Sequence, residues 1–324
     1  NAIAVKSDEK GEDKMKYIKG YTFTYDYRHN KLNDASSRES LRLMKESTNC
    51  DTVIFVLGAL QDNAQSEEID YLGEHMPTDE EMIEMIFFAK ALGLRVILKP
   101  FINCRDGTWR AHIHFFDMDI PHEPQWRNWF RNYTNYQLHY AKIAEMTGCE
   151  MVIIGCEMVM AQKRDTNWRD LIAQIREEYS GLLTYNADKY TEEYVPFWDA
   201  VDVISSSGYY PITDWEQELD RIEEVVRRVG KPFFFAEAGC PSRDTSPAIP
   251  NAWDAEGELS LSAQESYYRT MFAHCSQRKF VSGFAFWDWS TNLYSLSAAK
   301  SDTGYAVYGK PAASIIADFY QMER

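Results

Sequence analysis

Two glutamates, Glu157 and Glu237, each stand directly after an apolar stretch of the chain. Residues 151–156 read Met-Val-Ile-Ile-Gly-Cys, and residues 232–236 read Pro-Phe-Phe-Phe-Ala. Because an ionised carboxylate is costly to bury, its position at the exit of an apolar strand points to a function. Two carboxylates that converge on one cleft are the minimum equipment for cleaving a glycosidic bond. The alternative for each glutamate is a salt-bridged structural residue.

Cleavage of a glycosidic bond gives each glutamate a different role. Glu157 is the candidate general acid, which would protonate the leaving oxygen and then deprotonate the attacking water. Glu237 is the candidate nucleophile, which would attack the anomeric carbon and form a covalent glycosyl-enzyme. Enzymes that retain the anomeric configuration hold such carboxyls about 5–5.5 Å apart, and inverting enzymes hold them about 6.5–9.5 Å apart. The sequence does not give this distance.

Aromatic residues near the ends of two other apolar segments are candidates for contact with a sugar. Trp287 could stack beneath the sugar ring that is cleaved, although core packing more often explains a Phe/Trp run such as this one. Tyr209 follows the serine run Ser205–Ser207, and its hydroxyl could hold a nucleophilic carboxylate by a hydrogen bond. Trp289 and Tyr210 are weaker candidates of the same two kinds.

A polar cluster follows the third apolar segment. Lys99, Asn103 and Trp109 are its candidates for substrate binding, because such groups suit sugar hydroxyls or an adjacent carboxylate. Arg105 and Arg110 belong to the same cluster. A solvated loop is the plainer explanation of any one of these residues.

A metal-dependent hydrolase is an alternative raised by His112 and His114, which stand two residues apart and close to His122. Barrels of that kind carry such a histidine pair on the first strand, whereas this pair falls inside a loop. We therefore predict no metal site. The serine run lacks a G-x-S-x-G elbow, which argues against a serine hydrolase.

A parallel barrel is the arrangement that would bring these residues together. Apolar and amphipathic segments alternate eight times along the chain, which predicts a single (β/α)8 TIM barrel with enlarged loops at its C-terminal face. The predicted strands span 17–25, 52–57, 94–100, 151–157, 182–186, 201–206, 232–237 and 283–287. The predicted helices span 37–47, 79–92, 125–146, 167–179, 191–199, 214–229, 262–275 and 312–320.

The length of 324 residues fits one such barrel with long loops. Residues 1–15 are polar and charged and are predicted to form an N-terminal arm, and residues 16–324 are predicted to form the catalytic barrel. Catalytic groups of TIM barrels lie at the C-terminal ends of the strands. The three long connections that follow strand ends would therefore wall the active-site cleft; they span residues 58–77, 101–124 and 238–261.

The composition argues against several partners and leaves localisation open. The formal net charge of −16 argues against nucleic acid and against anionic membranes, which both attract basic patches. The sequence has no apolar run of 18 residues, so no transmembrane helix is predicted. Six cysteines without a CxxC pair slightly favour a cytoplasmic location, whereas loss of an export signal ahead of Asn1 would indicate an exported protein. The oligomeric state is unknown from the sequence.

Several segments, taken in order along the chain, resemble glycoside hydrolase family 113, the β-1,4-mannanases. The most specific is Leu-Lys-Pro-Phe-Ile-Asn-Cys-Arg-Asp-Gly-Thr-Trp-Arg over residues 98–110. The other similar segments are Pro-Thr-Asp-Glu-Glu (77–81) leading into Ala-Leu-Gly-Leu-Arg-Val-Ile (91–97), Ala-Glu-Ala-Gly (236–239), Phe-Trp-Asp-Trp (286–289) and Tyr-Gly-Lys-Pro-Ala (308–312). The resemblance covers about residues 16–320.

The resemblance implies a clan A (β/α)8 barrel that works by retaining double displacement, with Glu157 as acid/base and Glu237 as nucleophile. It implies β-mannan, glucomannan or manno-oligosaccharides as substrates, and neither a metal nor an organic cofactor. Subsite contacts are suggested at Lys99, Asn103, Tyr209 and Trp287. Many clan A barrels carry Asn directly before the acid/base, where this chain has Cys156.

Two alternatives to an endo-acting mannanase remain at this point. One is an exo-acting β-mannosidase or another clan A β-glycosidase, because loop lengths decide between an open groove and a blocked pocket. The other is a barrel that binds glycans without cleaving them. Binding alone would not need two opposed carboxylates, so the presence of both glutamates argues against the second.

Overall fold

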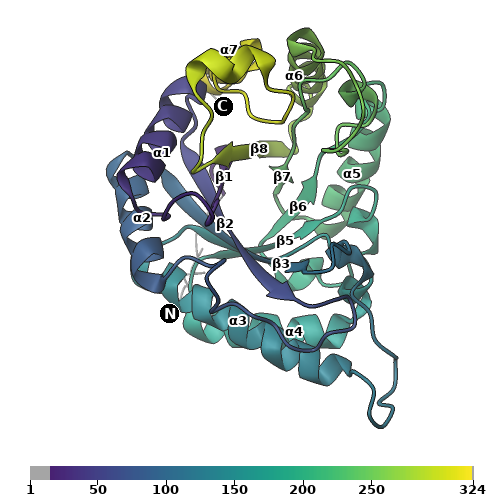
Figure 1. The fold of residues 1–324 in the computed structure, drawn as a ribbon. Coiled ribbons are helices and arrows are strands. Elements are labelled where there is room, and N and C mark those ends of the chain that lie inside the picture. The colour runs from purple at the N-terminus through teal and green to yellow at the C-terminus, as the bar shows by residue number, and fades with distance from the viewer. Residues whose placement is uncertain (1–14, 323–324) are drawn as a thin grey trace, which may run out of the picture.

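Eight parallel strands pair in the order of the sequence, and β8 pairs with β1 to close the sheet into a barrel. The structure is a computed structural model that describes residues 15–322, and helices surround the strands (Figure 1). The predicted single (β/α)8 barrel is confirmed. The polar arm predicted over residues 1–15 lies outside the described residues, apart from Met15.

All eight predicted strands are present. They are β1 (Ile18–Thr24), β2 (Thr52–Gln61), β3 (Arg95–Cys104), β4 (Met151–Cys156), β5 (Leu182–Ala187), β6 (Val203–Ser207), β7 (Phe233–Glu237) and β8 (Val281–Ser290).

The strands β2 and β3 run further than predicted. They pair with each other along ten residues each, from Thr52 opposite Arg95 to Gln61 opposite Cys104. The pairing of β2 with β1 reaches only Phe55, and that of β3 with β4 reaches only Leu98. The ends of β2 and β3 therefore form a two-stranded ribbon that extends beyond their outer neighbours (Figure 1).

The described residues contain seven α-helices. They are α1 (Ala35–Thr48), α2 (Asp79–Ala91), α3 (Trp126–Thr147), α4 (Asp165–Glu178), α5 (Trp215–Val229), α6 (Leu261–Cys275) and α7 (Pro311–Gln321). Local signals in the sequence set their ends. The Thr78 hydroxyl accepts a hydrogen bond from the amide of Glu81 at 3.1 Å and caps the start of α2. Gly230 ends α5 in the left-handed conformation.

The helix predicted over residues 191–199 is wrong. Two short 3-10 turns stand there instead, Glu192–Tyr194 and Trp198–Ala200. Pro196 lies between them; it has no amide hydrogen to donate and disfavours helical geometry at the residue before it. The connection from β5 to β6 therefore lacks the α-helix that its apolar pattern suggested.

Two apolar layers explain why the strands are almost continuously hydrophobic. Inside the barrel, Ile54, Ile97 and Phe234 belong to one buried cluster. Phe233 and Phe235, which flank Phe234 and lie on the other face of β7, belong to the outer cluster under the helices. In a parallel sheet covered on both faces, every position of a strand is buried. The three phenylalanines before Glu237 are thus core packing, and Glu237 is the residue of this strand that reaches the cleft.

None of the helices over residues 15–322 combines the length and apolarity needed to cross a bilayer. All six cysteines are buried.

The 3-10 segment after β5 supplies a stability test through Glu192. This carboxylate is fully buried and accepts hydrogen bonds from Ser206 Oγ at 2.5 Å and Arg221 Nη1 at 2.7 Å. We expect Glu192→Ala to lower the free energy of unfolding by about 3 kcal/mol, the lower end of the range for breaking a buried pair, because Glu218 still neutralises Arg221. Urea denaturation followed by circular dichroism measures this loss.

Glu193→Ala is the matched control, since Glu193 is adjacent in sequence, more exposed, and approaches Arg221 only to 3.9 Å. Its expected loss is below about 0.5 kcal/mol. Equal losses for the two variants would contradict a structural role specific to Glu192.

Candidate active site

Glu157 and Glu237 meet at the C-terminal mouth of the barrel. Glu157 follows β4, and Glu237 is the last residue of β7. One oxygen of each carboxylate and the Cys156 sulfur all lie within 4.8 Å of one another. This upper limit for the chosen oxygens is compatible with the separation of about 5–5.5 Å between the carboxyls of retaining glycosidases, and it is shorter than the 6.5–9.5 Å or so of inverting ones. The two carboxylates can therefore act on the two atoms of one bond.

The backbone of Glu157 departs from strand geometry. Its φ of +53° lies in the left-handed region, which residues other than glycine seldom occupy. Its amide donates to the carbonyl of Asn186 at 2.8 Å, which ties this turn to β5. Backbone conformations of this kind concentrate at functional sites, where the surrounding structure holds them in place.

Glu237 is paired with a buried lysine. The Lys99 ammonium donates to Glu237 Oε1 at 2.8 Å and to Asn186 Oδ1 at 2.8 Å, and the Lys99 residue is only 1% exposed. Burial lowers the pKa of Lys99, but the neighbouring Cys156 sulfur and the Glu237 carboxylate raise it more, so the net pKa lies above its usual value. Burial also raises the pKa of the Cys156 thiol. Because that thiol is neutral near pH 7, Glu237 is the charge that matters for Lys99.

Glu157 has an arginine partner of its own. Arg110 donates from Nη1 to Glu157 Oε1 at 2.8 Å, and from Nη2 to Asn103 Oδ1 at 2.9 Å. Its Nε donates to the carbonyl of Ile102 on β3 at 2.8 Å. The planar guanidinium is therefore held on three sides, and it fixes one oxygen of Glu157 while Oε2 stays on the side of Glu237.

Ser207 stands between the two carboxylates. Its hydroxyl lies 2.9 Å from Glu157 Oε2 and 3.2 Å from Glu237 Oε2. Asn186 donates from Nδ2 to the same hydroxyl at 3.0 Å. Both glutamates are thus salt-bridged, as the structural alternative foresaw, and they also share a hydrogen-bond donor at the mouth of the barrel.

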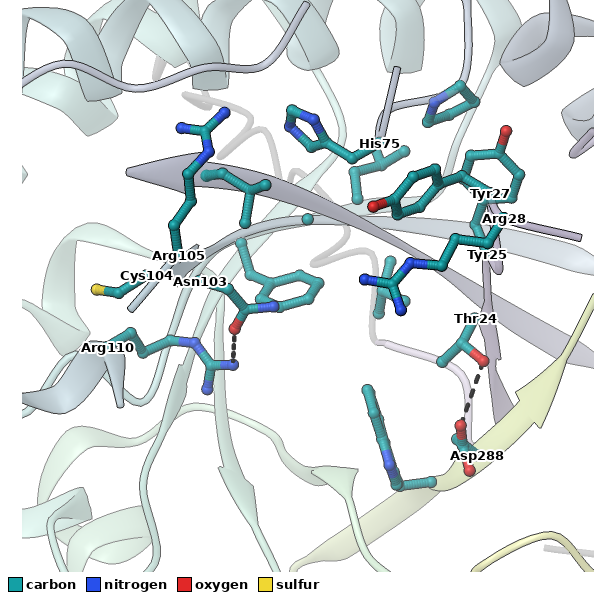
Figure 2. A pocket seen from close by; sticks show the side chains of 17 residues that line it. Thr24, Tyr25, Tyr27, Arg28, His75, Asn103, Cys104, Arg105, Arg110 and Asp288 are labelled. Carbon is teal, nitrogen blue, oxygen red and sulfur yellow. Dashed lines mark hydrogen bonds between the residues drawn. The ribbon is translucent and has the colours of Figure 1, made fainter. Parts of the chain in front are cut away.

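A cleft opens above this pair. A cavity of about 1250 Å³ is lined by both glutamates and by four of the five predicted substrate-binding residues, namely Asn103, Trp109, Tyr209 and Trp287. A second cavity of about 610 Å³ shares Asn103, Arg110 and Trp287 with the first, so the two are lobes of one cleft. In Figure 2 the Arg28 side chain reaches into this second lobe, and Thr24 donates to Asp288 in its wall.

Lys99 belongs to the polar cluster that the sequence offers to sugar hydroxyls or to an adjacent carboxylate, and here it lies beside a carboxylate. Its ammonium contacts Glu237 and Asn186 rather than open cleft. The mouth of the barrel therefore has Lys99 beneath it, whereas Trp109, which is 42% exposed, stands at its rim.

The weaker aromatic candidates belong to the core. Trp289 is fully buried and its indole donates to Ser40 Oγ at 3.1 Å. Tyr210 is fully buried and donates to Glu192 Oε1 at 2.6 Å. Tyr209 lines the cleft, but within the described residues the hydrogen bonds received by the Glu237 carboxylate come from Lys99 and Ser207.

Among the described residues, the potential metal ligands that lie close together do not include His112 or His114. Over residues 15–322, the one set of three potential ligands joins Cys156, Glu157 and Glu237, and it does not contain His112 or His114. Both carboxylates of that set already carry a cation, since Arg110 and Lys99 each lie 2.8 Å from one of them. A divalent ion would meet both positive charges.

Sequence reasoning misses Asn186 and Ser207, although each carries a signal. Asn186 interrupts the apolar strand Leu-Leu-Thr-Tyr-Asn-Ala, and Ser207 ends a run of three serines on β6. Buried polar groups need hydrogen-bond partners, so polar residues within a buried strand mark a network. The sequence alone does not tell which strands supply the partners.

Asp188, just after β5, is a second carboxylate close to Glu157. Burial first, and then the negative charge of Glu157, raise the pKa of Asp188 to about 7. An unfolded chain would give this group a pKa of about 3.9. Between these values the folded state binds the extra proton, so the contribution of Asp188 to stability is present below about pH 4 and is lost as the pH rises through about 7.

Asp188→Asn tests this linkage, because the amide does not titrate. We expect the free energy of unfolding of the wild type, minus that of the variant, to fall steadily as the pH rises from about 4 to about 7. Urea denaturation at a series of pH values measures both proteins, and the difference removes the titration of the groups that do not interact with Asp188. A difference that stays constant with pH would contradict the raised pKa of Asp188.

Comparisons with known proteins agree with this geometry. The sequence matches the model of Glycoside Hydrolase Family 113 over residues 21–310. A complex structure of a family 113 β-1,4-mannanase is 56% identical, with a TM-score of 0.93 over 95% of this chain and 100% of that one. The family 113 β-mannanase of Alicyclobacillus acidocaldarius, in complex with ManMIm, is 39% identical, with a TM-score of 0.91 over 95% of this chain and 98% of that one.

More distant likeness shows the fold alone. The β-glucuronidase of Ruminococcus gnavus is 14% identical, with a TM-score of 0.63 over 95% of this chain and 51% of that one. The comparison with curated proteins gave no match. The family match spans most of the chain and includes both strand-end glutamates, so this chain belongs to Glycoside Hydrolase Family 113 and is a glycoside hydrolase.

Proposed function

We propose that this glycoside hydrolase is a retaining endo-β-1,4-mannanase that cleaves mannan, glucomannan or manno-oligosaccharides by double displacement. The observation that carries the proposal is the carboxylate pair, whose oxygens approach within 4.8 Å at the floor of a large cleft. The substrate is inferred from relatives that are β-1,4-mannanases at 56% and 39% identity.

In the first step of this mechanism Glu157 protonates the glycosidic oxygen while Glu237 attacks the anomeric carbon. The bond from that carbon to the leaving oxygen breaks, and an ester bond to Glu237 forms. In the second step ionised Glu157 takes a proton from water, which attacks the same carbon and releases Glu237. Two inversions at one carbon retain the β configuration of the product.

The two cations divide the supporting work. Lys99 supplies the opposite charge that a buried, ionised nucleophile needs, so we assign it to Glu237 rather than to direct sugar binding. Arg110 holds Glu157 by its Oε1, which leaves Oε2 to carry the proton. A protonated carboxyl keeps only one hydrogen, so fixing the other oxygen also fixes where that hydrogen is presented.

Four residues that line the cleft are proposed to bind sugar. Trp287 offers an aromatic face beneath the ring that reacts, and Trp109 offers one at the rim. Asn103, held by Arg110, presents its amide to hydroxyl groups. Tyr209 is buried beside the nucleophile, where its hydroxyl is available to a sugar oxygen.

The stereochemistry of the product tests the mechanism. We expect proton NMR of freshly hydrolysed mannohexaose to show the β-anomer of the new reducing end first, followed by slow mutarotation. Glu157→Gln should lower kcat/KM on mannan by about 10²–10⁴-fold, the usual contribution of a general acid. Glu237→Gln should abolish hydrolysis, because no other nucleophile stands at that position.

Glu150→Gln is the matched control, because Glu150 directly precedes β4 and so lies at the opposite end of the barrel from Glu157. We expect its activity to equal that of the wild type. Initial release of the α-anomer, or near-normal turnover by Glu237→Gln, would overturn the double displacement with these two residues.

The two-lobed cleft favours endo action, since it gives room for sugar units beyond the one that reacts. We expect mannohexaose to yield mainly products of two or more units, resolved by anion-exchange chromatography over the first few per cent of reaction. Release of mannose alone from the chain end would reject the endo mode and indicate an exo-acting β-mannosidase. Measurable binding without any hydrolysis would indicate a non-catalytic barrel.

A further inference from the structure

The three serines at the end of β6 have three different environments. Ser205 Oγ donates to the carbonyl of Tyr185 at 2.9 Å, and Ser206 Oγ donates to buried Glu192 at 2.5 Å. Ser207 Oγ alone of the three faces the reacting pair, within 2.9 Å of Glu157 Oε2 and 3.2 Å of Glu237 Oε2. A single hydroxyl has only one proton, so it serves one carboxylate at a time.

Lys99 and Asn186 set the orientation of the Ser207 hydroxyl proton. The Lys99 ammonium can only donate, so the Asn186 oxygen must face it, 2.8 Å away. The Asn186 amide nitrogen is thereby turned to Ser207, and it donates to the Ser207 oxygen at 3.0 Å. Since this bond occupies the oxygen of Ser207 from one side, its own hydrogen is directed to the carboxylates. Ser207 itself is fully buried.

We propose that Ser207 is a positioning residue whose hydroxyl follows the negative charge through the reaction, donating to Glu237 in the free enzyme and to Glu157 in the glycosyl-enzyme. This inference rests on the proposed double displacement. When Glu237 becomes an ester it loses its charge, and when Glu157 gives its proton to the leaving oxygen it gains one. The hydroxyl rotates between the two acceptors and transfers no proton of its own.

The shared proton has a specific kinetic consequence. A hydrogen bond to the ionised form of a carboxylate favours that form, so removing the donor favours protonation. In the free enzyme, the first carboxylate to ionise accepts the hydrogen bond of the Ser207 hydroxyl. Ionisation of the second carboxylate then adds no further hydrogen bond. Loss of the hydroxyl therefore moves the acid limb of the kcat/KM profile to higher pH and leaves the basic limb in place.

Other titratable groups face the same pair and stay constant in the comparison. Besides Lys99 and Arg110, the described side chains whose charges interact with the two glutamates include Cys156, Asp188, Tyr209, Asp288 and Tyr305. None of them donates a hydrogen bond to Glu157 or Glu237 among the bonds seen over residues 15–322. A displacement of one limb in a Ser207 variant is therefore attributable to its hydroxyl.

The first experiment measures kcat/KM on mannohexaose against pH for the wild type, Ser207→Ala and Ser207→Thr. We expect Ser207→Ala to lose about 10- to 100-fold at the optimum, the range for a lost hydrogen bond to a charged group. Its acid limb should lie at higher pH with the basic limb unmoved, and Ser207→Thr, which keeps the hydroxyl, should restore the wild-type limb. Ser205→Ala is the matched control, because it removes a buried hydroxyl from the same strand without touching a carboxylate.

The second experiment follows the glycosyl-enzyme. With 2,4-dinitrophenyl β-mannobioside the leaving group needs no proton, so kcat reports hydrolysis of the intermediate. Because Glu157 must be ionised in that step, Ser207→Ala should move the acid limb of kcat to higher pH as well. An unmoved kcat limb would overturn the transfer of the hydrogen bond to Glu157.

The remaining outcomes are also decisive. A uniform loss of kcat/KM with both limbs in place would mean that Ser207 is only structural, and movement of the basic limb alone would mean that it serves Glu157 in the free enzyme. If thermal unfolding shows Ser207→Ala unfolded, Ser207→Cys, with its weaker donor, is measured under the same expectations. A wild type that hydrolyses neither substrate would instead refute the proposed function.

Discussion

The ion pair between Lys99 and Glu237 is the interaction on which the rest of the site depends. Lys99 is almost completely buried, and a buried ammonium is tolerated only beside an opposite charge. That opposite charge is the nucleophile itself. The same ammonium sets the orientation of Asn186, and through Asn186 that of Ser207. The position of the nucleophile and the direction of its hydrogen bonds thus follow from one electrostatic requirement inside the barrel.

Both catalytic candidates are anchored to one segment of the chain. Lys99 lies on β3, and Arg110 follows a few residues after its end. Arg110 donates a hydrogen bond to the carbonyl of Ile102 on β3 and forms an ion pair with Glu157. Lys99 forms the corresponding ion pair with Glu237. Residues 98–110 therefore hold the counter-charges of both carboxylates.

Much of the fold could be predicted because both faces of the sheet are buried. Continuous apolar runs such as 232–236 then mark strands, and a charged residue at the end of a run marks the mouth of the barrel. The helix predicted over 191–199 failed because the apolar pattern there serves two short turns around Pro196. Glu192, which local periodicity assigns to a helix, is instead fully buried through tertiary contacts.

The candidate site could be predicted only in part. Glu157 and Glu237 stand out because single carboxylates end apolar strands. Their separation follows from closure of the sheet, which no local pattern encodes. The sequence left Lys99 open to sugar hydroxyls or to an adjacent carboxylate, because its partnership with Glu237 depends on a strand far away in the sequence. The serine run marks a polar network inside a buried strand, but the partners of Ser207 come from other strands, so the sequence does not identify them.

The ribbon formed by the ends of β2 and β3 makes the two banks of the cleft mechanically unequal. One bank is a hydrogen-bonded ladder that holds Asn103 and Cys104 at the cleft surface. The opposite bank includes Asn251 and Trp253, which belong to the long connection between β7 and α6. Residues in such a connection can be substituted, and the connection can be lengthened, without breaking a strand. Divergence among related enzymes in the length of glycan they accept should therefore accumulate on the loop bank, while the ladder bank stays invariant in shape.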